Sequence, residues 1–379
     1  MIYLVYFAAS AYFAYLAFRA EDRKHFCLYS ALSIAVTVFL AGMRDMDIGI
    51  DVKNYYYLAR YWGSATQSES LQAYFAHYMT TGYGEVVFAL FIGLIGQLTG
   101  NFRLFLILSH LWIISGVYIG AFRQRKYVNP VLVLLLFYLF FFNHSLNIIR
   151  QYMAMAVIFA ALADVEERKH LRYAIAVIFA SLIHSTALLG LGALLIYWVL
   201  YGEIELGRRG SVRVSMTVRR LIIAGGLMMA VWGFLPVARF LMSEGILPKK
   251  YWYYLYPEGL TPSLIVMGLL VLELAAVYFR RNQLREQTPF FDFFLMCSVS
   301  YLILQQLTGI IEYGKRIAAY YSLNNIITIA LLASSCKTRK ERILVHGGIL
   351  AIALFYWWYM YILRNASGTY PYGFGFSIY

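Results

Sequence analysis

Long apolar runs alternate with short polar connections along the whole of this chain. A helix needs about 20 mostly apolar residues to cross a bilayer, because each residue adds only about 1.5 Å to its length. The pattern therefore predicts an all-α polytopic membrane protein with about twelve transmembrane helices. The predicted spans are residues 2–18, 26–43, 102–122, 130–142, 148–163, 172–183, 186–201, 221–237, 264–279, 290–307, 317–334 and 343–362.

One further apolar run, residues 86–98, is short and contains two glycines. If this run crossed the membrane, the basic connection 123–126 and every later basic connection would change sides. We therefore expect a re-entrant or surface-lying segment, which is tolerated where protein or water satisfies the peptide groups. A full crossing with a compensating break elsewhere is the alternative.

The positions of lysine and arginine give the expected orientation of the chain. Of the 32 basic residues, 21 fall in six short connections, and cytoplasmic loops of membrane proteins carry such an excess. These connections are residues 19–24, 123–126, 168–172, 208–220, 280–285 and 337–342. Both termini and the alternate connections are then predicted to face outward, namely residues 44–101, 143–147, 184–185, 238–263, 308–316 and the tail from 363.

Composition agrees with this class, since 61% of the residues are hydrophobic and only 13% are charged, against about 25% in soluble domains. The basic connections account for most of the net charge of +13, so no nucleic-acid partner is expected. The three cysteines show neither a disulfide framework nor a metal-binding spacing. We expect one membrane domain over residues 1–379, with outer loops 44–101 and 238–263 covering an active site.

Polar residues gather in the outward connections, and the densest group lies where a span begins after residue 147. Asn147 and Gln151 are four residues apart and share a helical face beside Arg150. An arginine at a helix end also reaches the lipid headgroups in many membrane proteins. A polar face is better suited to a cavity than to lipid, which favours a binding role.

A second polar group opens a late span. Arg316 and Tyr320 share a face by the same spacing, and Glu312 lies four residues before Arg316. An interfacial anchor is the alternative interpretation. Glu273 lies within a predicted span, where a lone carboxylate is costly, so we expect a packing contact with a neighbouring Tyr or Arg.

Three further outward positions carry groups that can transfer protons. His184 ends an apolar stretch, Glu85 precedes the short apolar run, and Asp51 lies in a loop that also holds Arg44. The alternatives are a structural histidine, an interface carboxylate and an ion pair inside the loop. Arginine forks match phosphate oxygens, and a carboxylate or histidine can accept a proton from a hydroxyl. This set favours sugar transfer from a lipid diphosphate without a metal or other cofactor.

At these residues the chain resembles the EpsG family, the Wzy-like membrane polymerases of bacterial exopolysaccharides and O-antigens. The matching motifs follow in the expected order from about residue 44 to residue 321. They are Arg44…Gly49-Ile50-Asp51…Tyr55, Tyr83-Gly84-Glu85, Asn147-Ile148-Ile149-Arg150-Gln151-Tyr152-Met153-Ala154, His184-Ser185-Thr186-Ala187-Leu188 and Arg316…Tyr320-Tyr321. Each motif is weak alone, and the ordered set is fairly specific.

The resemblance implies a GT-C-like glycosyltransferase of the bacterial cytoplasmic (inner) membrane, with its active site facing the periplasm. Its substrates would be undecaprenyl-diphosphate-linked oligosaccharide repeat units, and a flippase and a chain-length regulator would be its partners beside membrane lipids. By this analogy the catalytic residues are Asp51, His184 and Glu85. The substrate-binding residues are Arg44, Tyr55, Asn147, Arg150, Gln151, Arg316 and Tyr320. Either Asp51 or His184 would be the general base.

Two other functions remain open at this point. A transporter of lipid-linked oligosaccharides would also need basic cavity residues, but no internal repeat is visible and the polar clusters favour one face. An O-antigen ligase would use the same donor with a different acceptor. Repeat-unit structure and linkage cannot be inferred from the sequence.

Overall fold

The computed structural model describes residues 2–57, 85–99, 101–203, 214–246, 263–311 and 314–375, without the side chains of residues 97 and 98. Within these ranges the regular secondary structure is helical, which confirms the all-α prediction. Much of the two loops predicted to cover the active site, residues 58–84 and 247–262, lies outside the described residues.

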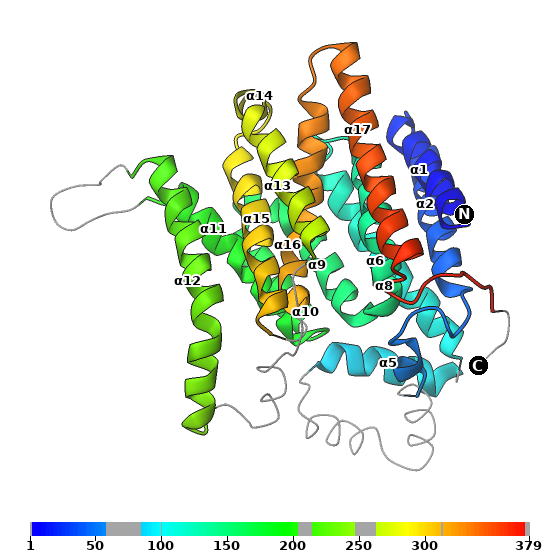
Figure 1. Ribbon diagram of the computed structural model, residues 1–379. Coiled ribbons are helices and arrows are strands. Elements are labelled where there is room, and N and C mark those ends of the chain that lie inside the picture. The colour runs from blue at the N-terminus through cyan, green and yellow to red at the C-terminus, as the bar shows by residue number, and fades with distance from the viewer. Residues whose placement is uncertain are drawn as a thin grey trace. The chain divides into compact units, whose positions relative to one another are not determined.

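Two compact units make up the chain, Met1–Leu188 with Ile343–Tyr379, and Leu189–Arg342 (Figure 1). The single membrane domain expected over residues 1–379 stays a prediction, and each unit is described by itself below.

The first unit is built mainly from helices in a row, each packed on the next. Its elements are α1 (Ile2–Arg19), α2 (Arg23–Gly42), α5 (Val86–Thr99), α6 (Phe102–Arg123), α7 (Pro130–Phe137), η1 (Tyr138–Phe142), α8 (Asn143–Asn147), α9 (Ile149–Glu166), α10 (His170–Ser181), α17 (Arg339–Trp357, from Ile343 on) and η5 (Trp358–Leu363). Helix α1 packs on α2, α2 on α6, α6 on α9 and α9 on α10. Asparagine caps start two of them, since Asn101 accepts from the Arg103 N–H and Asn129 from the Val131 N–H.

The second unit packs α15 against α16. Its elements are α11 (Leu191–Tyr201), α12 (Met216–Ser243), α13 (Leu264–Phe279), α14 (Arg281–Gln287), α15 (Phe291–Leu304), η4 (Gln305–Gly309) and α16 (Gly314–Ser334), while η2 (Ser185–Gly190) runs across the boundary between the units. Glu273 on α13 accepts a hydrogen bond from Asn325 on α16 at 2.6 Å. The expected helix-packing contact of Glu273 is therefore present, but its partner is an amide instead of a Tyr or Arg.

Eight helical segments in the described part of the chain are long and apolar enough to cross a membrane, so the chain is a multi-pass membrane protein. Each of the twelve predicted spans falls on helical structure, but twelve crossings are not confirmed. Helices α10, α11 and α13 have only 12, 11 and 16 residues. Helix α9 has 18 residues but carries three charges, on Arg150, Asp164 and Glu166.

The short apolar run forms α5, whose 14 residues give a length of about 21 Å, less than the ~30 Å of a hydrocarbon core. In Figure 1 its axis runs across the direction of α1, α6 and α17. The Val87 N–H donates to the Leu182 carbonyl at 2.9 Å, which fixes the start of α5 beside the end of α10. This arrangement favours the prediction that residues 86–98 do not cross the membrane.

Candidate active site

The first unit has two chemically different ends. At one end, here called the basic end, Arg123 at the end of α6 pairs with Asp164 at 2.7 Å and Glu167 at 3.3 Å near the end of α9. At the other end, the site end, Arg103 at the start of α6 donates to the carbonyl of Gly42 at the end of α2 at 2.9 Å. The basic connections 123–126 and 168–172 thus lie at the end opposite the starts of α6 and α9.

A buried carboxylate joins three separate segments at the site end. Glu85 Oε2 accepts from the Arg150 guanidinium at 2.6 Å, and Glu85 Oε1 is 2.7 Å from His184 Nδ1. The Ser185 N–H donates to the same Oε1 at 3.1 Å. The Glu85 side chain is 3% exposed, whereas those of Arg150 and His184 are 27% and 15% exposed. The carboxylate is therefore internal, and its two partners reach the surface.

The charge state of Glu85 follows from these contacts. Burial opposes ionisation, but the hydrogen bond from His184 and the charge of Arg150 outweigh burial and hold the pKa of Glu85 below its usual value of 4.5. An ionised carboxylate can only accept hydrogen bonds, so His184 Nδ1 must carry the proton. In neutral His184 the other ring nitrogen, Nε2, is then a proton acceptor, as in a carboxylate-oriented general base.

Aromatic rings surround the Arg150 guanidinium. Its Cζ lies 5.3 Å from the Phe88 ring centroid and 5.9 Å from the Tyr55 ring centroid, and both rings are buried. Burial raises the pKa of Tyr55, although Arg150 acts in the opposite sense through its charge and hydrogen bonds. These rings fix a planar cation at the start of α9, where the helix dipole also favours an anion.

Asp51 is tied to the same region through its backbone. The Asp51 N–H donates to Asn147 Oδ1 at 2.7 Å, so Asn147 links the loop to the break between α8 and α9. The Asp51 side chain is half-buried, and Gln151 is buried one residue after Arg150. Six predicted site residues besides Gln151 thus lie together in the first unit, namely Asp51, Tyr55, Glu85, Asn147, Arg150 and His184.

Arg44 lies inside the protein, with no exposed surface. It is 0% exposed, and its guanidinium donates to the carbonyls of Ala41 at 2.7 Å and Leu146 at 2.9 Å. Burial lowers the pKa of Arg44 to about 10, which still leaves a cation at neutral pH. The guanidinium satisfies carbonyls at the ends of α2 and α8, so the structure gives no support to direct diphosphate binding by Arg44.

Arg316 and Tyr320 belong to the second unit. Both lie on α16 with the expected spacing of four residues, Arg316 half-buried and Tyr320 buried. A Cβ at Gly314 would lie only 2.2 Å from the Leu307 carbonyl oxygen, so the start of α16 requires glycine. Glu312, predicted to orient Arg316, lies outside the described residues. Arg316 and Tyr320 are thus described by themselves, as a pair on α16 of the second unit.

Several contacts at the site end were not predicted from the sequence. Phe88 is one, and the position of an aromatic residue three places after Glu85 was the available signal. Others involve the C-terminal tail, where Asn143 Nδ2 donates to Thr369 Oγ1 at 2.9 Å and His144 Nδ1 lies 2.9 Å from Ser367 Oγ. Asn143 and His144 precede Arg150 by seven and six residues, and nothing in the sequence shows that the tail folds back onto them.

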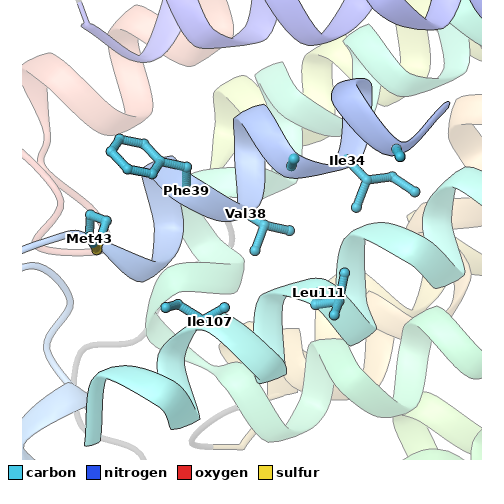
Figure 2. Close-up of a pocket in the computed structure, with 8 residues that line it drawn as sticks. Ile34, Val38, Phe39, Met43, Ile107 and Leu111 are labelled. Atoms are coloured by element: carbon cyan, nitrogen blue, oxygen red, sulfur yellow. The ribbon is translucent and has the colours of Figure 1, made fainter. Parts of the chain in front are cut away.

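A separate feature of the first unit is an apolar groove. A groove of about 540 Å³ runs between α2 and α6 and has an almost wholly apolar lining (Figure 2). It extends from Ala31, near the middle of α2, to Met43, the residue before Arg44. The groove holds no catalytic chemistry, but its apolar walls suit a hydrocarbon chain. Among the residues that the structure describes, no group of three or more His, Cys, Asp or Glu could hold a metal ion.

The family of this chain follows from comparison with known proteins. No curated protein and no solved structure shows a significant match. The sequence model of the EpsG family matches residues 27–374, a range that includes the Glu85–Arg150–His184 cluster and nearly all of the described helices. With a match over most of its length, this multi-pass membrane protein belongs to the EpsG family, and that membership indicates a polysaccharide polymerase.

Proposed function

We propose that the chain polymerises undecaprenyl-diphosphate-linked oligosaccharide repeat units at the outer face of the bacterial cytoplasmic membrane. The single observation that supports this proposal best is the buried Glu85 carboxylate, which holds Arg150 and His184 from two other segments. The Arg150 guanidinium is suited to binding a phosphate, and the His184 imidazole is suited to accepting a proton. The family membership and the basic end of the first unit agree with this chemistry and this orientation.

His184 would act as the general base. Its Nδ1–H is held by Glu85, so Nε2 would take the proton of an acceptor sugar hydroxyl as that oxygen attacks the anomeric carbon of the donor. The new glycosidic bond forms as the bond from the anomeric carbon to the diphosphate oxygen breaks. Asp51 is the other candidate base, and in this mechanism it would instead position the acceptor sugar.

Arg150 would stabilise the leaving group. As the bond to the sugar breaks, undecaprenyl diphosphate gains one negative charge, and a fixed guanidinium beside it lowers the free energy of the transition state. The guanidinium is oriented by Glu85, Phe88 and Tyr55 before any substrate binds, which reduces the reorganisation needed during the reaction. No metal is required in this mechanism. Arg316 remains a candidate for a second phosphate contact.

The apolar groove between α2 and α6 would accommodate part of the lipid carrier. It ends at Met43 (Figure 2). The loop that follows Met43 carries Asp51 and Tyr55. A chain lying there would leave its diphosphate at the site end of the unit. A flippase that delivers the repeat units and a regulator of chain length are the proposed partners.

Purified protein in proteoliposomes, incubated with lipid-linked repeat units, tests the proposal. Longer lipid-linked products support polymerisation. Transfer of single units to another glycolipid would identify a ligase, and movement of intact units across the bilayer without a covalent product would identify a transporter. Arg150→Ala should abolish elongation while single units persist, and normal products from this variant would contradict the role of Arg150.

A further inference from the structure

The C-terminal tail folds back over the loop that carries Asp51. Residues 365–375, here called the strap, follow the last helical segment and appear in red in Figure 1. Three backbone hydrogen bonds join strap and loop: Gly49 N–H to Gly368 O at 2.8 Å, Asp45 N–H to Gly373 O at 2.9 Å, and Gly375 N–H to Met43 O at 3.0 Å. Arg44 and Phe374 also form an isolated antiparallel bridge. The loop is thus bonded along residues 43–49 to a segment more than 300 residues away in sequence.

The strap is anchored to the helices beneath it. The Tyr3 hydroxyl donates to the Thr369 carbonyl at 2.8 Å, and the Tyr372 hydroxyl donates to the Leu40 carbonyl at 2.6 Å. The Asn143 side-chain amide donates to the Thr369 hydroxyl through Nδ2, and its Oδ1 accepts a hydrogen bond from Trp357 Nε1 at 2.9 Å. Because Ser367 and Thr369 are fully buried, the strap is an integral part of the first unit.

Close backbone contacts leave the loop little room to move. Gly49 has a φ of +103°, and a Cβ there would lie 2.8 Å from Val52 Cγ2 and 3.0 Å from the Leu146 carbonyl oxygen. Gly368 of the strap has a φ of +61°, and a Cβ there would lie 3.0 Å from Ile50 Cγ1. Ile50 directly precedes Asp51, whose N–H is held by Asn147 from the other side. The strap and the α8–α9 break therefore clamp the loop from two sides.

We propose that the strap is a positioning element of the active site, which sets the place of Asp51 relative to Arg150 during glycosyl transfer. This inference rests on the proposed function, because it assigns the strap an effect on that reaction. Its physical basis is the steep dependence of reaction rate on geometry, since a displacement of about 1 Å can lower a rate by about 100-fold. A strap that served stability alone would instead change the melting temperature without a specific effect on turnover.

Two glycines of the strap provide a matched pair of variants. Gly368→Ala introduces a Cβ in a left-handed conformation and presses it on Ile50. Gly373→Ala adds the same methyl group where the nearest atom, Asp45 Cβ, is 3.7 Å away, and it keeps the carbonyl that accepts from Asp45. Gly373→Ala therefore controls for the substitution without the push on the loop.

Each variant is assayed for elongation of lipid-linked repeat units, with kcat, KM and melting temperature measured on the same full-length preparation. We expect Gly368→Ala to lower kcat by about tenfold or more with little change in KM, and Gly373→Ala to keep the wild-type kcat. Asp51→Asn should also lower kcat. Amide hydrogen exchange of residues 44–51 should quicken in Gly368→Ala and not in Gly373→Ala.

The results distinguish a failure of the strap's positioning role from a failure of the proposed polymerase function. Equal kcat for the two glycine variants, or unchanged exchange of residues 44–51 in Gly368→Ala, overturns the positioning role even if Asp51→Asn is inactive. A loss of kcat that only follows a fall in melting temperature also overturns it. If the wild-type protein elongates nothing, the proposed function fails, and the exchange data then decide whether the strap restrains the loop.

Discussion

Two buried glutamates lie at opposite ends of the first unit, and their surroundings give them opposite properties. Glu85 at the site end is held by Arg150 at 2.6 Å, by His184 at 2.7 Å and by a backbone N–H, and its pKa is lowered. Glu166, at the end of α9 beyond the predicted span, bonds Gln124 and lies 3.5 Å from Lys126. Burial raises the pKa of Glu166 to about 6, because the neutral Gln124 amide and the Lys126 ammonium compensate for burial only in part.

The difference shows that burial of a carboxylate does not by itself identify a reactive site. Glu166 is as deeply buried as Glu85, but its partners, Gln124 and Lys126, both come from the basic connection 123–126. Glu85 has partners from two other motifs, and the side chains of Arg150 and His184 reach the surface, where a substrate can contact them. What distinguishes the site end is therefore an ionised carboxylate that orients an accessible cation and an accessible proton acceptor.

The largest effect should come from removing the His184 imidazole, the proposed proton acceptor. His184→Ala removes the base that Glu85 orients, and the elongation rate should fall by about 100-fold or more. His25→Ala is the control, since His25 is an exposed histidine near the basic end with an acidic partner of its own, Asp22. Initial rates of elongation in proteoliposomes measure both. A His184→Ala variant as active as His25→Ala would transfer the role of base to Asp51.

The next largest effect should come from replacing an arginine by lysine, and it should differ between the two ends. Arg150→Lys keeps the charge but loses the planar fork that can bond Glu85 and a phosphate together, so we expect a loss of elongation rate of about tenfold. Arg123→Lys makes the same exchange in the Asp164 pair at the basic end and should leave the rate unchanged. Equal rates for the two variants would remove the distinction between the ends.

The smallest effects concern stability, and here the two glutamates should respond with opposite signs. Because the folded pKa of Glu85 is lowered, its ionisation stabilises the protein above pH 4.5, and this contribution is lost as pH falls through the folded pKa. Glu85→Gln should therefore destabilise the protein at pH 7, by on the order of 2 kcal/mol.

Glu166 has a raised pKa, so its ionisation destabilises the folded state, fully above pH 6 and not below pH 4.5. Glu166→Gln should raise stability at pH 7 by on the order of 1 kcal/mol, and the gain should disappear as pH falls below 6. Melting temperatures of both variants and the wild type between pH 4 and pH 8 test this pair. Shifts of the same sign would contradict the electrostatic difference between the two ends.

Much of the helical architecture could be predicted because the hydrophobic pattern has the length and period of membrane helices. The shorter helices could not be counted as crossings in this way, since the apolar part of the 12-residue helix α10 has the same local pattern as part of a longer span. The return of residues 365–375 to the first loop depends on backbone hydrogen bonds, which leave no periodic signal in a sequence.

The residues of the candidate site could be predicted from the sequence, but the contacts between them could be predicted only to a smaller extent. Glu85, Arg150 and His184 stood out because each placed a costly polar group at the end of an apolar run. Their mutual contacts depend on tertiary packing over up to 100 residues of separation. Arg44 shows the limit most clearly, because an arginine that caps buried carbonyls and one that binds phosphate look alike in a sequence.

The elongation rate of Glu85→Gln is the most direct test of the central claim, that one buried carboxylate organises a glycosyltransferase site. This variant keeps the size of the side chain but loses the charge that fixes Arg150 and the tautomer of His184. This organising role predicts a rate lower by about 100-fold in folded protein at pH 7, with lipid-linked repeat units left as single units. A folded Glu85→Gln protein that elongates at the wild-type rate would contradict it.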